Sequence, residues 1–222
     1  MSRADEPSAC TAIVLAGGDR APASLRARLP HADLVIAADG GLAQAAALGL
    51  TVDVVVGDFD SVKPDDLAAA EDAGARVERH PAAKEHTDLE LALIAARDRA
   101  ATRVVVVGAW GGRVDHELAN LLLLGSDDYA SLALEAIDAR GRVIAVRDTC
   151  EITGAPGDLV TLLAVGGAAK GVRTTGLRYP LHGETLAPGS SRGVSNELVE
   201  TVATVSVATG VVLVVAPDTG VV

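Results

Sequence analysis

The stretch of the chain that is best suited to chemistry is Asp53 to Ser61, with the sequence DVVVGDFDS. Its three consecutive valines favour a buried β-strand, and Gly57 allows the backbone to turn where the strand ends. Asp58 and Asp60 follow, two residues apart, so they point the same way if the extended geometry persists. Two carboxylates in this arrangement can share one hard cation, and Mg²⁺ is the natural candidate. The residues also suit a simple polar turn, because Asp and Ser hydrogen-bond to their own backbone.

The elements around this stretch repeat a pattern of apolar strand, polar turn and helix. Strands are predicted at 11–16, 33–38, 54–56, 75–79 and 103–107. Helices are predicted at about 22–29 and 42–48, from Pro64, from Thr87 and after Gly112. Thr87 and Glu90 form a capping box, which places Asp88 in the first turn of its helix. This alternation is typical of an α/β domain with an open parallel sheet and flanking helices, which is a Rossmann-like fold.

Polar clusters follow the ends of all five predicted strands. They begin at Gly17, Asp39, Asp58, Lys84 and Gly108. Because ligands of open α/β sheets bind at the carboxyl ends of the strands, we expect these clusters to share one edge and form a site. A helix-start acid favoured by the helix dipole is the alternative for Asp88, and a solvated loop lysine is the alternative for Lys84.

The second half of the chain has a different character from about Tyr129 onward. Residues 132–138 and 142–147 are predicted to form a hairpin, and 159–165, 171–177 and 202–208 resemble strands. Thr209 and Gly210 are predicted to form a turn that leads to a last strand at 211–215. We therefore expect two domains, an α/β domain at 1–135 and an all-β sandwich at 136–222.

The overall composition excludes several classes of partner. The chain has 222 residues, 49% of them apolar, and a formal net charge of −11 without a cluster of Lys and Arg, which argues against nucleic-acid binding. No apolar run approaches the roughly 20 residues of a membrane helix, and the first ten residues do not resemble a secretion signal. Cys10 and Cys150 form no ligand pair. We expect a cytoplasmic protein without a membrane partner.

The ordered set of motifs resembles the thiamine pyrophosphokinase family. The matching segments are Ala38–Gly41 (ADGG), Gly57–Ser61 (GDFDS), Lys84–Asp88 (KEHTD), Gly111–His116 (GGRVDH) with Asn120, Thr175–Leu177, Tyr179–Leu181 and Gly193–Glu197 (GVSNE). They run from about residue 12 to the C-terminus. Two positions depart from the family pattern: Glu85 stands where Asp is common, and Trp110 stands where a small polar residue is usual.

The resemblance implies a homodimer that transfers the diphosphoryl group of ATP to the hydroxyl of thiamine and releases AMP. Such a transfer needs oxygen ligands for Mg²⁺, backbone donors for phosphate and cationic side chains. We predict Asp58, Asp60 and Asp88 as the magnesium ligands. Lys84 is one of only three lysines, and together with Arg113 it is the predicted phosphate contact. An ordinary surface arginine is the alternative for Arg113.

The remaining candidates bind substrate. Glycine pairs let backbone amides approach a nucleotide, although plain tight turns also explain them. Asp39 and Asp115 could orient substrate, accept the hydroxyl proton or cap a helix. By resemblance, one pair in the second domain contacts thiamine, and that domain also supplies the dimer contact. The glycine pairs are Gly40 with Gly41 and Gly111 with Gly112, and the thiamine pair is Ser195 with Asn196.

Three other functions compete with this interpretation. A related pyrophosphokinase acting on a pterin alcohol would keep the acids of the first domain but would not need Ser195 and Asn196. A catalytically silent sensor of thiamine or nucleotide would not need all three predicted magnesium ligands. A dinucleotide-dependent oxidoreductase is disfavoured, because no GxGxxG motif follows the first strand.

Overall fold

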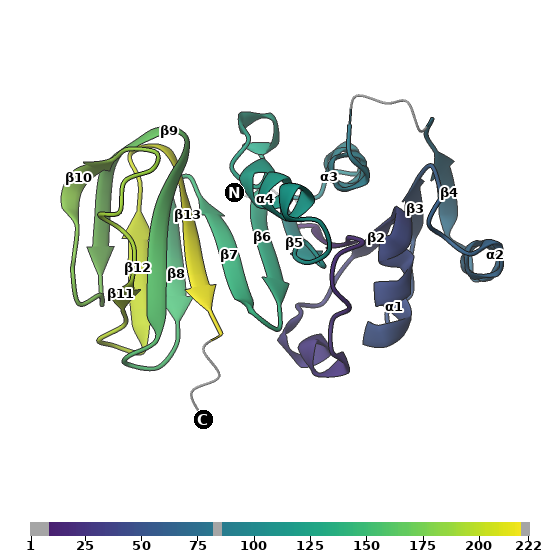
Figure 1. Ribbon diagram of the computed structural model, residues 1–222, viewed down its shortest axis with the longest axis horizontal. Coiled ribbons are helices and arrows are strands. Elements are labelled where there is room, and N and C mark those ends of the chain that lie inside the picture. The colour runs from purple at the N-terminus through teal and green to yellow at the C-terminus, as the bar shows by residue number, and fades with distance from the viewer. Residues whose placement is uncertain (1–8, 82–85, 219–222) are drawn as a thin grey trace, which may run out of the picture. The chain divides into compact units, whose positions relative to one another are not determined.

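The computed structural model describes residues 9–81 and 86–218, which divide into two compact units, Met1–Ala109 and Trp110–Val222. The first unit contains a five-stranded parallel sheet in the order β4-β3-β2-β1-β5. Its strands are β1 (Thr11–Leu15), β2 (Leu34–Ala38), β3 (Val54–Gly57), β4 (Arg76–Arg79) and β5 (Arg103–Val107). Figure 1 shows them with the helices beside them. The predicted α/β class is confirmed, and β-branched runs such as Val104–Val107 form its buried core.

The helices of this unit are α1 (Leu42–Leu48), α2 (Pro64–Asp72) and α3 (Asp88–Asp98). Helix α3 begins as the capping box predicts, because Thr87 Oγ1 accepts a hydrogen bond from Glu90 N at 3.2 Å. Its apolar positions recur at helical spacing, and Leu89, Ala92 and Leu93 are buried against β1, β2 and β3. Burying each leucine contributes about 1.5–3 kcal/mol, so packing against the sheet stabilises α3 more than its cap does.

The segment predicted as a helix at about 22–29 is a short 3₁₀ helix, η1 (Ala23–Arg28). Pro22 and Pro30 bracket it, and Pro30 biases Leu29 towards the extended conformation that it adopts, with φ −81° and ψ 142°. Six residues between two prolines are too few for a stable α-helix. A second 3₁₀ turn, η2 (Asp39–Gly41), leads directly into α1.

The second unit begins with α4 (Val114–Leu123) and η3 (Asp127–Tyr129), and then becomes antiparallel. Strands β6 (Ala133–Asp138) and β7 (Gly141–Val146) form the predicted hairpin. The others are β8 (Thr149–Thr153), β9 (Leu159–Thr175), β10 (His182–Leu186), β11 (Asn196–Glu197), β12 (Val202–Ser206) and β13 (Thr209–Pro217). Strand β13 joins β7 to β9, while β12 joins β8 to β9.

Strand β9 differs from the prediction, because one strand of 17 residues replaces the two expected at 159–165 and 171–177. Its first half pairs with β13 and its second half with β10 and β12, so it passes from one antiparallel layer to the other (Figure 1). Left-handed glycines at Gly166 (φ +70°) and Gly171 (φ +64°) permit the bend. Val160, Val172 and Val214 belong to one apolar cluster built from both layers, which accounts for the sandwich.

Thr209 and Gly210 do not form the predicted turn. They lie inside β13, where the pairing with β9 shifts register between Thr209 and Val211. The preceding strand β12 pairs with β8 and β9, whereas β13 pairs with β7 and β9, so the two strands are not a hairpin. The predicted turn is therefore wrong, and Gly210, with φ +92°, lies at an irregularity inside the strand. The division between domains at 135/136 stays a prediction, since the compact units separate at Ala109.

No helix within 9–81 or 86–218 is long and apolar enough to cross a membrane.

Candidate active site

Three carboxylates meet at the carboxyl ends of β2 and β3. One oxygen from each of Asp39, Asp58 and Asp60 lies within 4.8 Å of the others. Asp39 directly follows β2, and the two other acids follow β3, which is paired with β2 in parallel. Neighbouring parallel strands end at the same edge of a sheet, and this is why acids about twenty residues apart in sequence converge.

Asp39 is the buried member of this acidic cluster, with 9% of its surface exposed. Its Oδ2 accepts a hydrogen bond from the Ser61 hydroxyl, whereas its Oδ1 is buried and has no hydrogen-bond partner among the described residues. A buried carboxylate oxygen without a donor is costly unless something else compensates its charge. The site thus holds three carboxylates, and one of them carries a buried oxygen without a hydrogen-bond partner among the described residues.

Asp88, the third predicted magnesium ligand, enters the same region from α3. A Cβ atom added to Gly57 would lie 3.3 Å from Asp88 Oδ1 and 3.1 Å from Asp39 Cβ. The Asp88 carboxylate and the start of the Asp39 side chain therefore both lie next to Gly57, and a larger residue there would push into both. The structure thus places Asp39 with Asp58 and Asp60, and it places Asp88 next to Gly57, outside this group of three.

Several residues of the predicted site motifs have a strained backbone conformation. Asp39 (φ +43°), Phe59 (φ +64°), Ala100 and Ser195 (φ +56°) are the four non-glycine residues of the described segments with positive φ. Three of the four lie in predicted site motifs, and such conformations persist only where surrounding contacts enforce them. The guanidinium of Arg79 lies 5.1 Å from the centre of the Phe59 ring, which helps to hold the turn.

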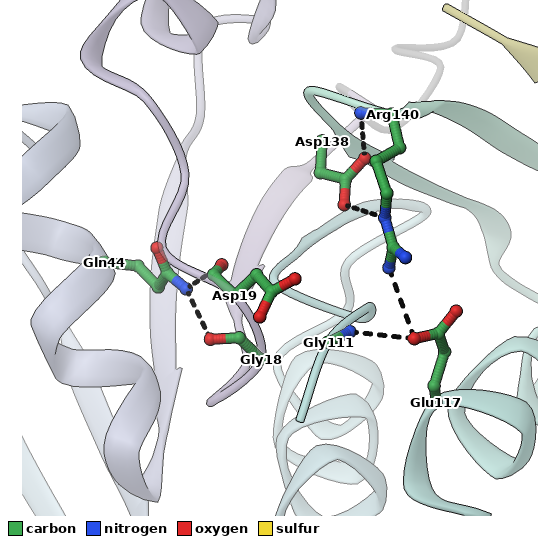
Figure 2. A network of polar contacts seen from close by, with 7 residues as sticks. All are labelled: Gly18, Asp19, Gln44, Gly111, Glu117, Asp138 and Arg140. Carbon is green, nitrogen blue, oxygen red and sulfur yellow. Dashed lines mark hydrogen bonds and ion pairs between the residues drawn. The ribbon is translucent and has the colours of Figure 1, made fainter. Parts of the chain in front are cut away.

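The glycine turn after β2 is close-packed. A Cβ atom on Gly41 would lie 1.9 Å from the carbonyl oxygen of Leu15, so no other residue fits there. The Gly17–Ala21 segment borders this turn, and the buried side chain of Gln44 holds it (Figure 2). Gln44 Nε2 donates to the Asp19 carbonyl at 2.9 Å, and its Oε1 accepts from Ala21 N at 2.9 Å. A glutamine inside α1 thus ties down the turn after β1.

A groove of about 650 Å³ runs between α1 and α2. Its lining includes Gly40, Ser61 and the cationic residues Arg20 and Lys63. Because Ser61 hydrogen-bonds Asp39, this groove begins beside the acidic cluster. Its volume lies in the range of small-molecule sites.

The predicted phosphate contacts have different outcomes. Lys84 lies outside the described residues. Arg113 lies at the start of α4, where its Nε and Nη2 donate to the carboxylate of Asp115 at 3.1 and 2.5 Å. This hydrogen-bonded guanidinium lowers the pKa of the Asp115 carboxyl. Both side chains are largely exposed, so Arg113 can exchange this partner for another anion at little cost.

The second glycine pair adopts a conformation that other residues resist. Gly111 has φ +96° and Gly112 has φ +73°. The amide of Gly111 donates to Glu117 Oε2 at 3.1 Å, which fixes the loop to the first turn of α4 (Figure 2). The shape of this loop therefore depends on both glycines, since other residues would be strained at these angles.

The predicted thiamine pair separates into two roles. Asn196 is 3% exposed; its Oδ1 accepts from Tyr179 N at 3.0 Å and its Nδ2 donates to Tyr179 O at 2.8 Å. It therefore holds the Tyr179 segment from inside the fold. Ser195 is exposed, and its amide donates to Thr161 Oγ1 at 3.0 Å. Its φ of +56° is a backbone conformation that few non-glycine residues adopt.

Sequence reasoning did not single out two residues of the first unit, Ser61 and Gln44. Ser61 belongs to the GDFDS motif, and its place beside two acids was the available signal. Gln44 is polar within an alanine-rich helix, a pattern that marks either solvent exposure or a buried hydrogen bond. The sequence left the role of Asp39 open between orienting substrate, accepting a proton and capping a helix, and strand ends alone do not reveal that it lies beside Asp58 and Asp60.

Comparisons with known proteins agree with the motifs. Residues 25–133 match a family model described as the catalytic domain of thiamin pyrophosphokinase, and residues 148–212 match one described as its vitamin B1 binding domain. The chain is 26% identical over 192 residues to a thiamine pyrophosphokinase of Bacillus subtilis (strain 168), covering 82% of this chain and 86% of that protein.

Solved structures show the same similarity. A crystal structure of thiamine pyrophosphokinase from Bacillus subtilis superposes with a TM-score of 0.80 at 26% identity, covering 93% of this chain and 98% of the other. The thiamin pyrophosphokinase of Geobacillus thermodenitrificans gives a TM-score of 0.78 at 26% identity, covering 96% and 100%. With both family models matched in order along the sequence, the chain belongs to the thiamin pyrophosphokinase family.

Proposed function

We propose that this protein is a thiamine pyrophosphokinase that converts ATP and thiamine to AMP and thiamine diphosphate. The thiamine hydroxyl oxygen forms a bond to the β-phosphorus of ATP. The bond between that phosphorus and the oxygen bridging to the α-phosphorus breaks, and AMP leaves with this oxygen. The proton of the hydroxyl is released. The observation that carries the proposal is the acidic cluster of Asp39, Asp58 and Asp60 at the strand edge of a chain that matches both family models.

The acidic cluster fits Mg²⁺. Its donors are all carboxylate oxygens, which hard cations prefer, and the buried Oδ1 of Asp39 lacks any other described partner. Asp39, Asp58 and Asp60 would hold the ion, with Asp88 beside them. A bound Mg²⁺ would neutralise phosphate charge and hold the diphosphoryl group in line with the attacking oxygen. Without such a cation, three carboxylates would repel a polyanionic substrate.

The chain's own residues bind and orient the substrates. The amides of Gly40 and Gly112 are the proposed phosphate donors, since both residues are at least partly exposed, whereas Gly41 is buried and the Gly111 amide already donates to Glu117 Oε2. Arg113 and Lys84 are the proposed cationic contacts. The groove lined by Arg20 and Lys63 supports a nucleotide next to the acidic cluster, because two cationic side chains in its lining suit phosphate groups.

The thiamine end of the reaction belongs to the second unit. Ser195 is exposed and suits direct contact with the aminopyrimidine, whereas Asn196 holds the neighbouring Tyr179 segment in place. We include a homodimer and a cytoplasmic location in the proposal. Light scattering tests the homodimer: a mass twice that of one chain supports it, and a monomeric mass in an active sample contradicts it.

Nucleotide analysis tests the activity. Purified protein is incubated with ATP, Mg²⁺ and thiamine, and with the same mixture lacking thiamine. Thiamine-dependent formation of AMP and thiamine diphosphate supports the proposal. Formation of ADP would mean transfer of a single phosphoryl group, and binding without turnover would indicate a silent sensor. Turnover of a pterin alcohol in place of thiamine would favour the related pyrophosphokinase.

A further inference from the structure

The turn between β6 and β7 carries an arginine whose direction is fixed by its own loop. Arg140 N donates to Asp138 Oδ1 at 2.6 Å, and Arg140 Nε lies 3.5 Å from Asp138 Oδ2. Asp138 is 7% exposed, and its carboxylate binds both the backbone amide and the guanidinium of Arg140. A side chain anchored at its backbone and at its guanidinium loses little further entropy when it makes a third contact.

That third contact reaches α4. Arg140 Nη2 lies 3.3 Å from Glu117 Oε2, and the same oxygen accepts the hydrogen bond from Gly111 N at 3.1 Å. Figure 2 shows Asp138, Arg140, Glu117 and Gly111 joined in this order. The hydrogen bond from Gly111 and the ion pair with Arg140 both lower the pKa of Glu117, so the carboxylate is charged near neutral pH.

The same arginine also contacts the residue before Gly111. Its guanidinium carbon lies 5.9 Å from the centre of the Trp110 ring, and Trp110 is only 8% exposed. Arg140 thus reaches two consecutive residues, Trp110 directly and Gly111 through Glu117. The glycines that follow have no side chain with which to anchor themselves, and a glycine loop has the largest conformational entropy to lose.

We propose that Arg140 is a positioning residue that, through Glu117 and Trp110, holds the Gly111–Gly112–Arg113 loop in the shape that binds the phosphates of ATP. That Arg140 orders the loop follows from the contacts alone. That the ordered loop binds the phosphates of ATP rests on the proposed function. All the residues of this network lie in the second unit. Because Arg140 and Glu117 are partly exposed, their ion pair adds little to global stability, and its effect falls on the loop.

The loop can be observed without any substrate, because Trp110 is the only tryptophan of the chain. We expect Arg140→Gln and Glu117→Ala to shift Trp110 emission to longer wavelength and to raise its acrylamide quenching constant about twofold. Arg140→Lys keeps the charge but not the planar fork, so it should restore part of the wild-type spectrum. The matched control is Arg97→Gln, which removes an arginine with an exposed ion pair on α3 and should leave the spectrum unchanged.

Kinetics supply the second measurement. For Arg140→Gln, KM for ATP with saturating Mg²⁺ and thiamine should rise about fivefold to tenfold, while kcat changes less than about twofold. Unchanged quenching in both Arg140→Gln and Glu117→Ala would overturn the positioning role. Altered quenching with an unchanged KM would overturn the link to phosphate binding. If the wild type made no AMP at all, the proposed function would fail, and the quenching experiment would still decide whether Arg140 orders the loop.

Discussion

The hydroxyl of Ser61 donates a hydrogen bond to Oδ2 of Asp39, and Oδ1 of the same buried carboxylate has no partner among the described residues. The hydrogen bond from Ser61 therefore restricts rotation of the Asp39 carboxylate, which belongs to the acidic cluster. This arrangement fixes the direction of a charge that the fold itself leaves uncompensated. It makes Ser61 an orienting group for the proposed magnesium site.

Replacing Ser61 by alanine should weaken metal binding more than it weakens the fold. Without the hydroxyl, Asp39 can rotate, so we expect the Mg²⁺ concentration for half-maximal activity to rise about fivefold or more, with the melting temperature nearly unchanged. A magnesium titration of the initial rate measures this. Ser131→Ala removes an exposed hydroxyl in the second unit and is the control. An unchanged magnesium requirement in Ser61→Ala would mean that Asp39 needs no such support.

Neutralising the acidic cluster should separate stability from activity. In Mg²⁺-free buffer, Asp60→Asn relieves repulsion among the carboxylates and should raise the melting temperature slightly. Added Mg²⁺ should stabilise the wild type by mass action but should stabilise the variant much less. Turnover should fall by about 100-fold or more, because charge neutralisation of the diphosphoryl group is lost.

Two measurements on the same samples check this prediction: thermal melts at several Mg²⁺ concentrations, and rates of AMP formation. Asp72→Asn, which changes an exposed acid at the end of α2, is the matched control and should behave like the wild type. Equal stabilisation of Asp60→Asn and wild type by Mg²⁺ would place the ion elsewhere.

The glycine turn after β2 should tolerate no side chain. In Gly41→Ala the new Cβ would lie 1.9 Å from the Leu15 carbonyl oxygen, so β1 and the turn must separate, and we expect a loss of about 3 kcal/mol or more in the free energy of unfolding. Gly49→Ala is the comparison, since Gly49 has φ +62° but open space around it, and it should cost about 1 kcal/mol. Urea unfolding measures both, and equal losses would contradict the close approach.

The ion pair between the exposed residues Arg113 and Asp115 should change how the Asp115 carboxyl titrates with pH. Arg113→Ala should return the pKa of Asp115 upward towards its ordinary value, which carboxyl-carbon NMR titration detects. Because the pKa in the folded state is depressed, the pair stabilises the fold above the unfolded pKa of Asp115, and this contribution is lost as the pH falls through the folded pKa. The effect on global stability should be small because both groups are exposed. An unshifted titration in the variant would show that the pair does not persist in solution.

Truncation of Asn196 should reduce the stability of the fold, whereas truncation of Ser195 should weaken thiamine binding. Asn196→Ala leaves the backbone groups of Tyr179 without partners and should cost about 2–4 kcal/mol of stability. Ser195→Ala should cost less than about 0.5 kcal/mol, because the residue is exposed, but it should raise KM for thiamine. Urea unfolding and initial rates at varied thiamine separate the two roles. A stability loss in Ser195→Ala equal to that in Asn196→Ala would contradict this division.

Local signals in the sequence were enough for the α/β unit. The valine runs at 54–56 and 104–107 are buried strands, and the box of Thr87 and Glu90 caps α3. They succeed because strand and helix here depend on neighbours within a few residues. The strand ends also predicted that the acids would gather at one edge, since parallel strands share their carboxyl ends.

The tertiary structure decided which groups meet. Asp39 joins Asp58 and Asp60, β9 continues through its glycines into a second layer, and Arg140 reaches the loop of Gly111 from a hairpin about thirty residues away. None of these follows from periodicity, because each depends on strand register and on contacts between segments far apart in sequence. The sequence by itself determined the chemistry available and the edge where it collects. Only packing determined the direction of each carboxylate and amide, since a side chain's rotamer and hydrogen-bond partner are set by what lies against it.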